Sequence, residues 1–150
     1  MDLAIRVVER MWEREHHLRH IKDGVWGPML GADGELLEGI EGMKGVSGIK
    51  KDGSRIGADF IRMQPGARFK PHVHEGDHEI YFISGAGYVH INGEDVEVTA
   101  GHLIHIPGEY THGVWVGQDA TEPLVFTAIG HPHSHVDAPD RMQHPPEHEH

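Results

Sequence analysis

The residues of this chain best suited to chemistry are its histidines, 16 among 150 residues. Imidazole is the commonest neutral metal ligand, and it titrates near neutral pH. His72 and His74 are two positions apart in a predicted strand, so both side chains point to the same face and can bind one ion. His78 follows on the next predicted strand, and His112 on a later one. Four imidazoles would leave up to about two positions open in an octahedral site, so the pattern predicts one divalent metal.

Glu79 is an alternative to His78 as the third ligand, because a shift of one residue in this strand would turn the carboxylate inward. Strand alternation ties the choice to the neighbouring residues. If His78 points inward, Ile80 and Phe82 do as well, whereas an inward Glu79 would turn those two side chains outward.

A shell of neutral imidazoles leaves the metal its full double positive charge. Such an ion should favour a substrate that arrives as an anion, such as an enolate, a catecholate or a carboxylate. Imidazole suits Fe, Mn, Cu, Ni and Zn, and the pattern does not choose among them. An all-nitrogen shell counts against Mg and Ca, which prefer oxygen.

Other side chains near these histidines are candidates for binding or catalysis. By alternation, Arg68 and Lys70 lie on the face of the first two histidines, where they could hold a substrate carboxylate or reach solvent at the mouth of the barrel. His105 could donate a hydrogen bond or shuttle a proton near the metal, or could be structural. Tyr110, two residues before His112, is a weak candidate for an acid.

The elements that must position these residues are β-strands. Asn92-Gly93 between alternating apolar runs is a strong hairpin signal. Closely spaced strands with tight turns predict an all-β sandwich or barrel. The predicted strands are 57–63, 68–74, 78–84, 88–91, 94–98, 103–106, 112–116 and 124–129.

The rest of the chain divides around this domain. Apolar residues at helical spacing predict a helix over 2–22, with His16 and His20 at i,i+4 on an exposed face. Residues 23–130 form the predicted domain, in which the glycine-rich segment 23–56 is typical of loops and short strands. Residues 131–150, rich in His and Pro, are predicted to be a flexible tail.

Composition excludes several classes of protein. The absence of cysteine rules out disulfides, thiolate metal sites and a cysteine nucleophile. A formal net charge of −11 argues against a nucleic-acid partner. No apolar run approaches the ~20 residues that span a membrane, and no secretory signal is evident, so a cytoplasmic location is expected.

Two stretches resemble the two motifs of the cupin family. The first motif is Gly, five residues, His-x-His, three or four residues, Glu, six residues, Gly; the second is Gly, five residues, Pro-x-Gly-x-x-His, three residues, Asn. The usual glutamate falls at His78, seven residues before Gly85, and the second motif has Glu109 for its middle glycine and Val116 for its asparagine. The matching residues are Gly66, His72, His74 and Gly85, then Gly101, Pro107 and His112.

The resemblance, over about residues 57–130, implies a cupin fold: a double-stranded β-helix, or jelly-roll barrel, here with an N-terminal helix. The histidine in place of glutamate is similar to a four-histidine subgroup of small cupins. The family implies a metal-dependent dioxygenase, with a redox-neutral lyase, isomerase or decarboxylase, or a non-catalytic small-molecule-binding cupin, as alternatives. It also implies a homodimer and a small-molecule substrate or ligand.

Overall fold

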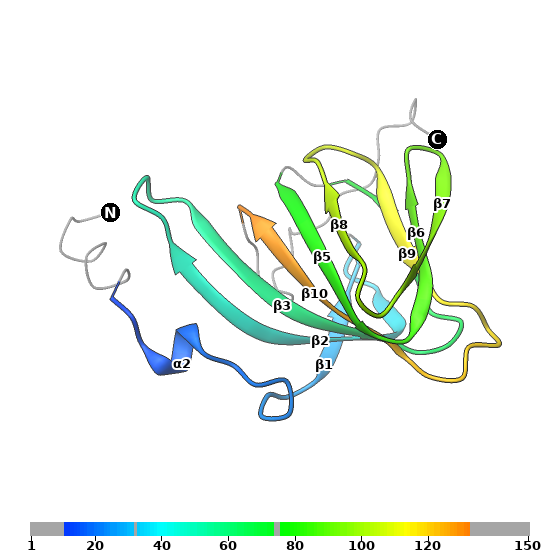
Figure 1. The fold of residues 1–150 in the computed structure, drawn as a ribbon, viewed down its shortest axis with the longest axis horizontal. Helices are drawn as coiled ribbons and strands as arrows, with labels where there is room; N and C mark the ends of the chain where they lie inside the picture. The colour runs from blue at the N-terminus through cyan, green and yellow to red at the C-terminus, as the bar shows by residue number, and fades with distance from the viewer. Residues whose placement is uncertain (1–10, 32, 74–75, 133–150) are drawn as a thin grey trace.

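The chain folds into two antiparallel β-sheets that face each other across a hydrophobic core (Figure 1). The computed structural model describes residues 11–31, 33–73 and 76–132. The first sheet has the order β1 (Gly27–Leu30), β2 (Leu36–Ile49), β3 (Arg55–Met63), β10 (Leu124–His131), β5 (Asp77–Ser84), β8 (Leu103–Ile106). The second has the order β4 (Arg68–His72), β9 (His112–Trp115), β6 (Ala86–Ile91), β7 (Glu94–Thr99).

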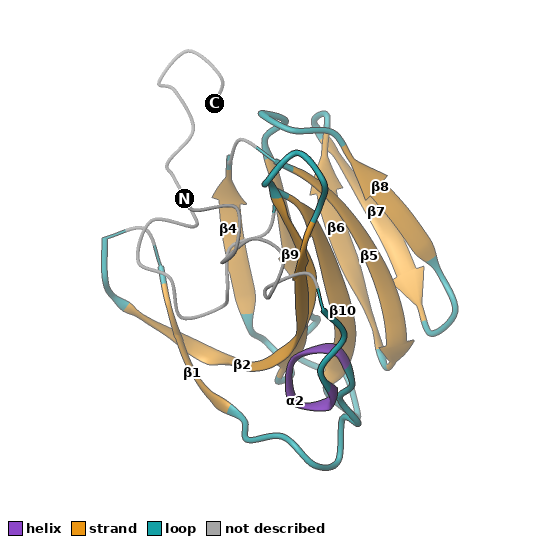
Figure 2. Ribbon diagram, turned by 90° about the vertical axis from the view of Figure 1, so that its left-hand side faces the viewer, coloured by secondary structure: helices purple, strands orange, loops and turns teal. Residues whose placement is uncertain are grey.

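Strands distant in sequence meet in both sheets. β10 lies between β3 and β5 (Figure 1), and β9 lies between β4 and β6 (Figure 2). All four of these strand pairs are antiparallel. Two facing sheets of this kind are the jelly-roll form of a β-protein, and the described strands are not joined into one closed barrel. The predicted all-β jelly roll is confirmed, as two sheets rather than as a closed cylinder.

The core is built from alternate residues of these strands. In β5, Ile80 and Phe82 are 3% and 0% exposed, whereas Tyr81 and Ile83 between and after them are 43% and 38% exposed. Phe82 packs against Phe126 of β10, with ring centroids 5.4 Å apart. One face of the first sheet is thus buried against the second sheet, as expected for a two-layer β-protein.

The predicted strands are reproduced with ends within two residues of those expected, as far as the described residues extend. The turn at Asn92-Gly93 has φ values of 54° and 76°, which are the two left-handed positions of a type I′ hairpin. β10 continues to His131, so the predicted tail contributes its first residue to the sheet. Residues 133–150 of the tail lie outside the described residues.

The glycine-rich segment before residue 57 is more regular than predicted. It contains β2, a strand of 14 residues that pairs with β3 from Ile40↔Met63 to Ile49↔Arg55. The pairing shifts by one residue between Lys44 and Val46, which marks a bulge. Gly45 lies at this bulge, where a Cβ would overlap the carbonyl oxygen of Ala58, so the close approach of the two backbones favours glycine there.

The predicted N-terminal helix is much shorter in the described part of the chain. Only α2 (Arg14–His17) is helical, and Leu18 is already extended at φ −138° and ψ 126°. Met11, Trp12 and Leu18 are 60%, 65% and 53% exposed, so no apolar face of a helix is buried here. Short helices are marginal without such packing, which is why the periodicity overstated the helix.

Residues 1–10 of the predicted helix lie outside the described residues. No helix in the described ranges has the length and apolar character that crossing a bilayer requires.

Candidate metal centre

Three of the four predicted metal ligands come together between the two sheets. His72 ends β4, His112 begins β9 and His78 lies near the start of β5. The rings of His72 and His112 have centroids 4.5 Å apart, and those of His78 and His112 are 6.3 Å apart. They border a cavity of about 40 Å³ whose described lining is His72, His78, His112, Ile61, Phe69, Ile80, Val114, Phe126 and Ala128.

Strand pairing accounts for this convergence. His72 is the register partner of His112 in the second sheet. His78 belongs to the first sheet and points inward with Ile80, which also lines the cavity. The three imidazoles therefore reach the cavity from both layers, and His112 itself is 2% exposed.

Two of the rings are oriented by backbone carbonyls. Nδ1 of His72 lies 2.9 Å from the carbonyl oxygen of Lys70, and Nδ1 of His112 lies 2.8 Å from that of Tyr110. A carbonyl only accepts, so each Nδ1 carries a proton, and in the neutral ring Nε2 is then the nitrogen with the lone pair. Metal-binding histidines are commonly held in this way by a partner on the other ring nitrogen. The donor set and its tautomers thus fit a transition metal.

The fourth predicted ligand, His74, lies outside the described residues. Among the residues that the structure describes, no group of three or more His, Asp or Glu side chains is arranged to hold an ion. The three imidazoles are therefore an incomplete site without a further ligand, and the four-histidine set stays a prediction.

Glu79 lies on the opposite face of β5 from His78. Its two carboxylate oxygens lie 2.5 Å from Nδ1 of His105 and 2.9 Å from Nε2 of His131. His105, considered above as a proton shuttle, is thus engaged with Glu79 on the outer face of the sheet, and its side chain is 54% exposed. Neither residue belongs to the described lining of the cavity.

The expectation that Arg68 and Lys70 share a face with His72 is wrong. Both are exposed, while Phe69 between them is buried and lines the cavity. Phe69 pairs with Val114 and His72 with His112, so three steps along β4 match two along β9. This bulge reverses the alternation between residues 69 and 72, which simple period-two counting cannot anticipate.

The loop before His112 carries a departure from the family motif. Glu109, at the position of the family's glycine, has a φ of 63°, a left-handed conformation that disfavours residues with a side chain. Tyr110 follows it and is 38% exposed, and its described role is to present its carbonyl to His112. The backbone shape of the motif is kept although its glycine is not.

Asp59 is a buried polar residue that the sequence interpretation overlooked. It is 2% exposed and shares the inner face of β3 with Ile61, while its register partner Ala128 also lines the cavity. Its Oδ1 accepts a hydrogen bond from the backbone N–H of Gly45, 2.9 Å away, at the bulge in β2. Alternation in 57–63 was the signal that could have revealed it.

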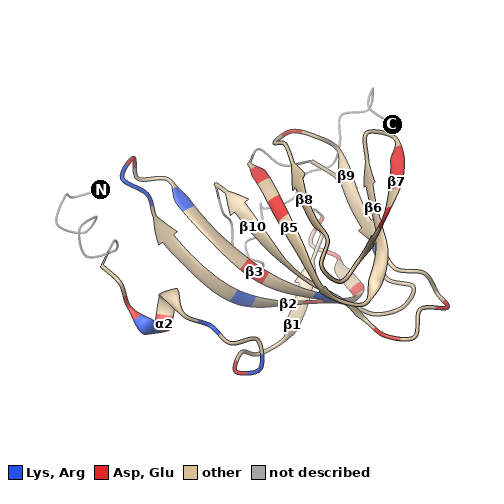
Figure 3. Ribbon diagram, in the orientation of Figure 1, with Lys and Arg blue, Asp and Glu red and all other residues tan. Residues whose placement is uncertain are grey.

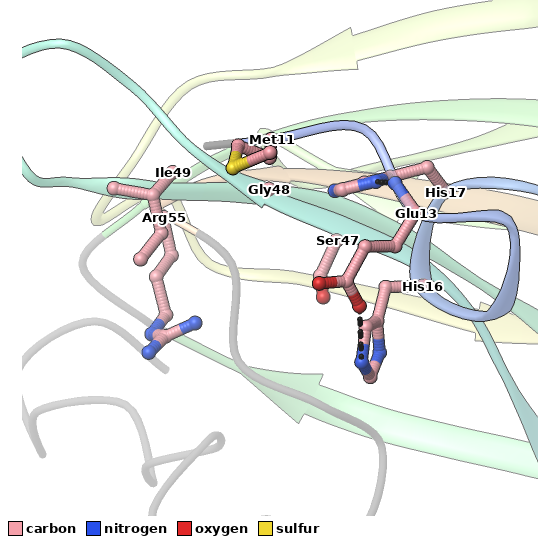
Figure 4. Close-up of a pocket in the computed structure, with 8 residues that line it drawn as sticks. All are labelled: Met11, Glu13, His16, His17, Ser47, Gly48, Ile49 and Arg55. Atoms are coloured by element: carbon pink, nitrogen blue, oxygen red, sulfur yellow. Dashed lines mark hydrogen bonds and ion pairs between the residues drawn. The ribbon is translucent and has the colours of Figure 1, made fainter. Parts of the chain in front are cut away.

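A second hollow, of about 220 Å³, lies between α2 and the paired ends of β2 and β3 (Figure 4). One side carries the ion pair of His16 with Glu13, 3.4 Å apart, and the other side carries Arg55. His16 and His20 are both exposed, as expected, and His16 contacts the carboxylate of Glu13, the residue that precedes α2.

Residues 59–130 match the model of the cupin domain. An oxalate-binding protein from Thermotoga maritima is 40% identical over 58 residues, which are 37% of this chain and 48% of that protein. The chain thus matches about half the length of this curated relative.

Solved structures agree on the fold. A polyketide cyclase from Streptomyces resistomycificus is 24% identical, with a TM-score of 0.60 over 80% of this chain and 79% of that one. A cupin-2 domain from Rhodospirillum rubrum is 16% identical, with a TM-score of 0.64 over 89% and 83%. The family match leads to one conclusion, with which these folds agree: the chain carries a cupin domain over residues 59–130.

Proposed function

We propose that this protein is a metal-dependent cupin enzyme that acts on a small anionic substrate. One divalent transition metal would be held by His72, His74, His78 and His112. The observation that carries the proposal is the convergence of three imidazoles from both sheets on one internal cavity.

The chain's own residues would prepare the site in two ways. The carbonyls of Lys70 and Tyr110 orient two of the rings through Nδ1, so that Nε2 of each ring would be the atom that binds the metal. The remaining described lining is apolar, which excludes water and strengthens electrostatic attraction inside the cavity. When bound, the metal would supply Lewis acidity and, if it is iron, manganese or copper, redox chemistry.

The substrate class follows from charge and size. Neutral ligands leave a doubly positive ion, which favours an anion. The cavity of about 40 Å³ has room for roughly three water-sized groups beside the rings. A small carboxylate or enolate, whose oxygens enter the cavity while its body stays outside, meets both conditions. The relative named as an oxalate-binding protein is in keeping with this class.

We favour oxidative chemistry of the dioxygenase type. A redox-neutral lyase or isomerase needs a protein group that moves a proton at the substrate. In the described lining, the only ionisable side chains are the three imidazoles, which would be occupied as ligands. Reaction with dioxygen depends less on such a group, because the substrate itself supplies the electrons that reduce dioxygen and a redox-active metal would pass them on.

Binding without turnover is the second candidate. It is favoured by the name of the curated relative, which records binding of oxalate. In that case oxalate would bind at the metal and remain unchanged.

The first experiment is the metal content of the full-length protein, measured by plasma mass spectrometry. The matched variants are His72→Ala and His112→Ala, which retain the other histidines of the chain. The difference between wild type and variant then reports the internal site alone. One metal per chain that both variants lose would support the proposal, and equal metal content in all three proteins would refute it.

The second experiment separates the chemistries. The metal-loaded protein is mixed with oxalate, a diketone, a catechol and a thiol in an oxygen electrode. Uptake of dioxygen with one of them, abolished by His112→Ala, would support the oxygenase. Binding of oxalate by calorimetry, without uptake or product, would favour the binding protein.

We also propose that the protein is a homodimer. The outer face of the first sheet exposes Tyr81, Ile83 and Leu103, which are 43%, 38% and 66% accessible on neighbouring strands β5 and β8. Sedimentation velocity of wild type and of Leu103→Glu would test this, since a charge in such an interface should give a monomer.

A further inference from the structure

Four ionisable side chains gather on the outer face of the first sheet, directly behind the cavity. Asp77 and Glu79 belong to β5, His105 to β8 and His131 to β10. Figure 3 shows the acidic positions of β5 in red at one end of that strand. His78, which lines the cavity, lies between them in sequence.

Glu79 connects three neighbouring strands. One carboxylate oxygen contacts Nδ1 of His105 at 2.5 Å, and the other contacts Nε2 of His131 at 2.9 Å. His105 is the register partner of Glu79 on one side, and β10 is the paired strand on the other. The carboxylate therefore ties β8 and β10 to β5 at the residue next to His78.

Asp77 holds the other side of the same segment. Its Oδ1 accepts a hydrogen bond of 2.6 Å from the backbone N–H of Gly108. Gly108 lies in the loop that runs from β8 to His112. Since Asp77 and Glu79 flank His78, they restrain the backbone of that residue from both sides, and Asp77 also connects it to the loop that carries His112.

We propose that Asp77 and Glu79 are positioning residues for the metal centre, which set the distance between His78 and His112 from outside the cavity. The inference rests on the proposed metal site. It explains why β5 carries a carboxylate at 79 although that side chain points away from the cavity: the carboxylate acts through the strand that carries the ligand.

The physical reason is the narrow tolerance of metal geometry. A metal accepts its ligands only within a few tenths of an ångström, and residues outside the ligand set that hold the ligands in place change affinity by about 10- to 100-fold. His78 is the one described ligand on the first sheet, so its position relative to the two ligands of the second sheet depends on how β5 is anchored. Removing an anchor should loosen that position and weaken metal binding.

The test compares Glu79→Gln with Glu41→Gln. Glu41 also accepts bonds from a cation on the outer face of the same sheet, from Arg62 at 2.8 and 3.1 Å, but it lies on β2 and touches no histidine of the cavity. Both substitutions replace one carboxylate by an amide of the same shape. Affinity for Co²⁺ is measured on the full-length protein by competition with a chelator, and the Co²⁺ absorption spectrum reports the ligand geometry.

We expect Glu79→Gln to weaken Co²⁺ binding about 10-fold or more and to change the spectrum, and Glu41→Gln to do neither. Asp77→Ala, which removes the acceptor of the Gly108 N–H, should weaken binding in the same direction. If Glu79→Gln does not fold, His105→Gln takes its place in the comparison. This variant removes the contact between His105 and Glu79 from the histidine side.

Three results are distinguishable. Equal affinity and spectra for all variants, with cobalt bound at the internal site of the wild type, would overturn the positioning role and leave the proposed function intact. Equal losses in Glu79→Gln and Glu41→Gln would also overturn it, because the effect would then be one of general stability. Absence of an internal cobalt site in the wild type would instead overturn the proposed function on which the inference rests.

Discussion

Replacement of Gly45 by alanine tests how the bulge in β2 holds the buried carboxyl group of Asp59 beside the cavity. A Cβ at position 45 would overlap the carbonyl oxygen of Ala58 and lie 3.0 Å from its carbonyl carbon. Both atoms are backbone, so the strands must separate. The hydrogen bond from the Gly45 N–H to Oδ1 of Asp59, 2.9 Å long, would be stretched or lost.

The expected loss in the free energy of unfolding of Gly45→Ala combines two effects. Overpacking against a rigid neighbour costs about 1–3 kcal/mol, and weakening the bond to a buried acceptor costs about 1–3 kcal/mol. These terms overlap because one movement causes both, so we expect a loss of about 3 kcal/mol in the free energy of unfolding.

Gly48→Ala is the matched control on the same strand. A Cβ there meets nothing within 4 Å, and the position requires no left-handed backbone. We expect it to be neutral or up to about 1 kcal/mol stabilising, because alanine restricts the unfolded chain.

Chemical denaturation of both variants provides the measurement, with the midpoint and slope fitted separately. If Gly45→Ala unfolds within about 1 kcal/mol of Gly48→Ala, the close approach at the bulge does not constrain the fold and this reasoning fails.

Three further predictions concern the loop, the second sheet and the metal. Glu109→Gly should raise the free energy of unfolding by about 1 kcal/mol, since glycine adopts a φ of 63° without strain; a loss of stability on denaturation would contradict this. The hydrogen bond from His90 is the main cause that lowers the pKa of Asp95 below its usual 3.8, so the bond stabilises the fold above that pH and the contribution is lost as pH falls through the lowered value. Thermal melting should therefore show Asp95→Asn below wild type at neutral pH and equal to it in strong acid; a constant gap would argue against the pair. Excess Co²⁺ at 100 times its dissociation constant should stabilise the wild type by about 2.7 kcal/mol, and a chelator or His112→Ala should remove the gain; an equal gain in that variant would locate the metal elsewhere.

The positions of most strands could be predicted from sequence because their apolar residues alternate and their turns have distinctive residues. Asn92-Gly93 predicted a hairpin, and both residues take the left-handed φ values that such a turn needs. The histidine spacing likewise predicts a shared site for His72, His74, His78 and His112. Local periodicity and turn chemistry are short-range properties, so they are readable along the chain.

The N-terminal helix could not be predicted reliably for the opposite reason. Its apolar residues have helical spacing, but a helix of this length depends on a surface to pack against, and Met11, Trp12 and Leu18 remain exposed.

β2 was underestimated because glycine has low strand propensity on its own. Pairing with β3 along nearly its whole length compensates for that, and pairing is a tertiary property.

The sequence by itself determined the sandwich or barrel class, and the spacing of its histidines predicted imidazole as the candidate metal ligand. It left His78 and Glu79 as alternatives, because they are adjacent in one strand and either side chain could face the core. Tertiary structure decided the orientation: Phe82 and Ile80 are buried against the second sheet, which turns His78 inward and Glu79 outward. It also decided that a bulge in β4 turns Phe69 and His72 to one face while Lys70 stays exposed. Which face of a strand is buried depends on what packs against it, and that information lies in strands far away along the chain.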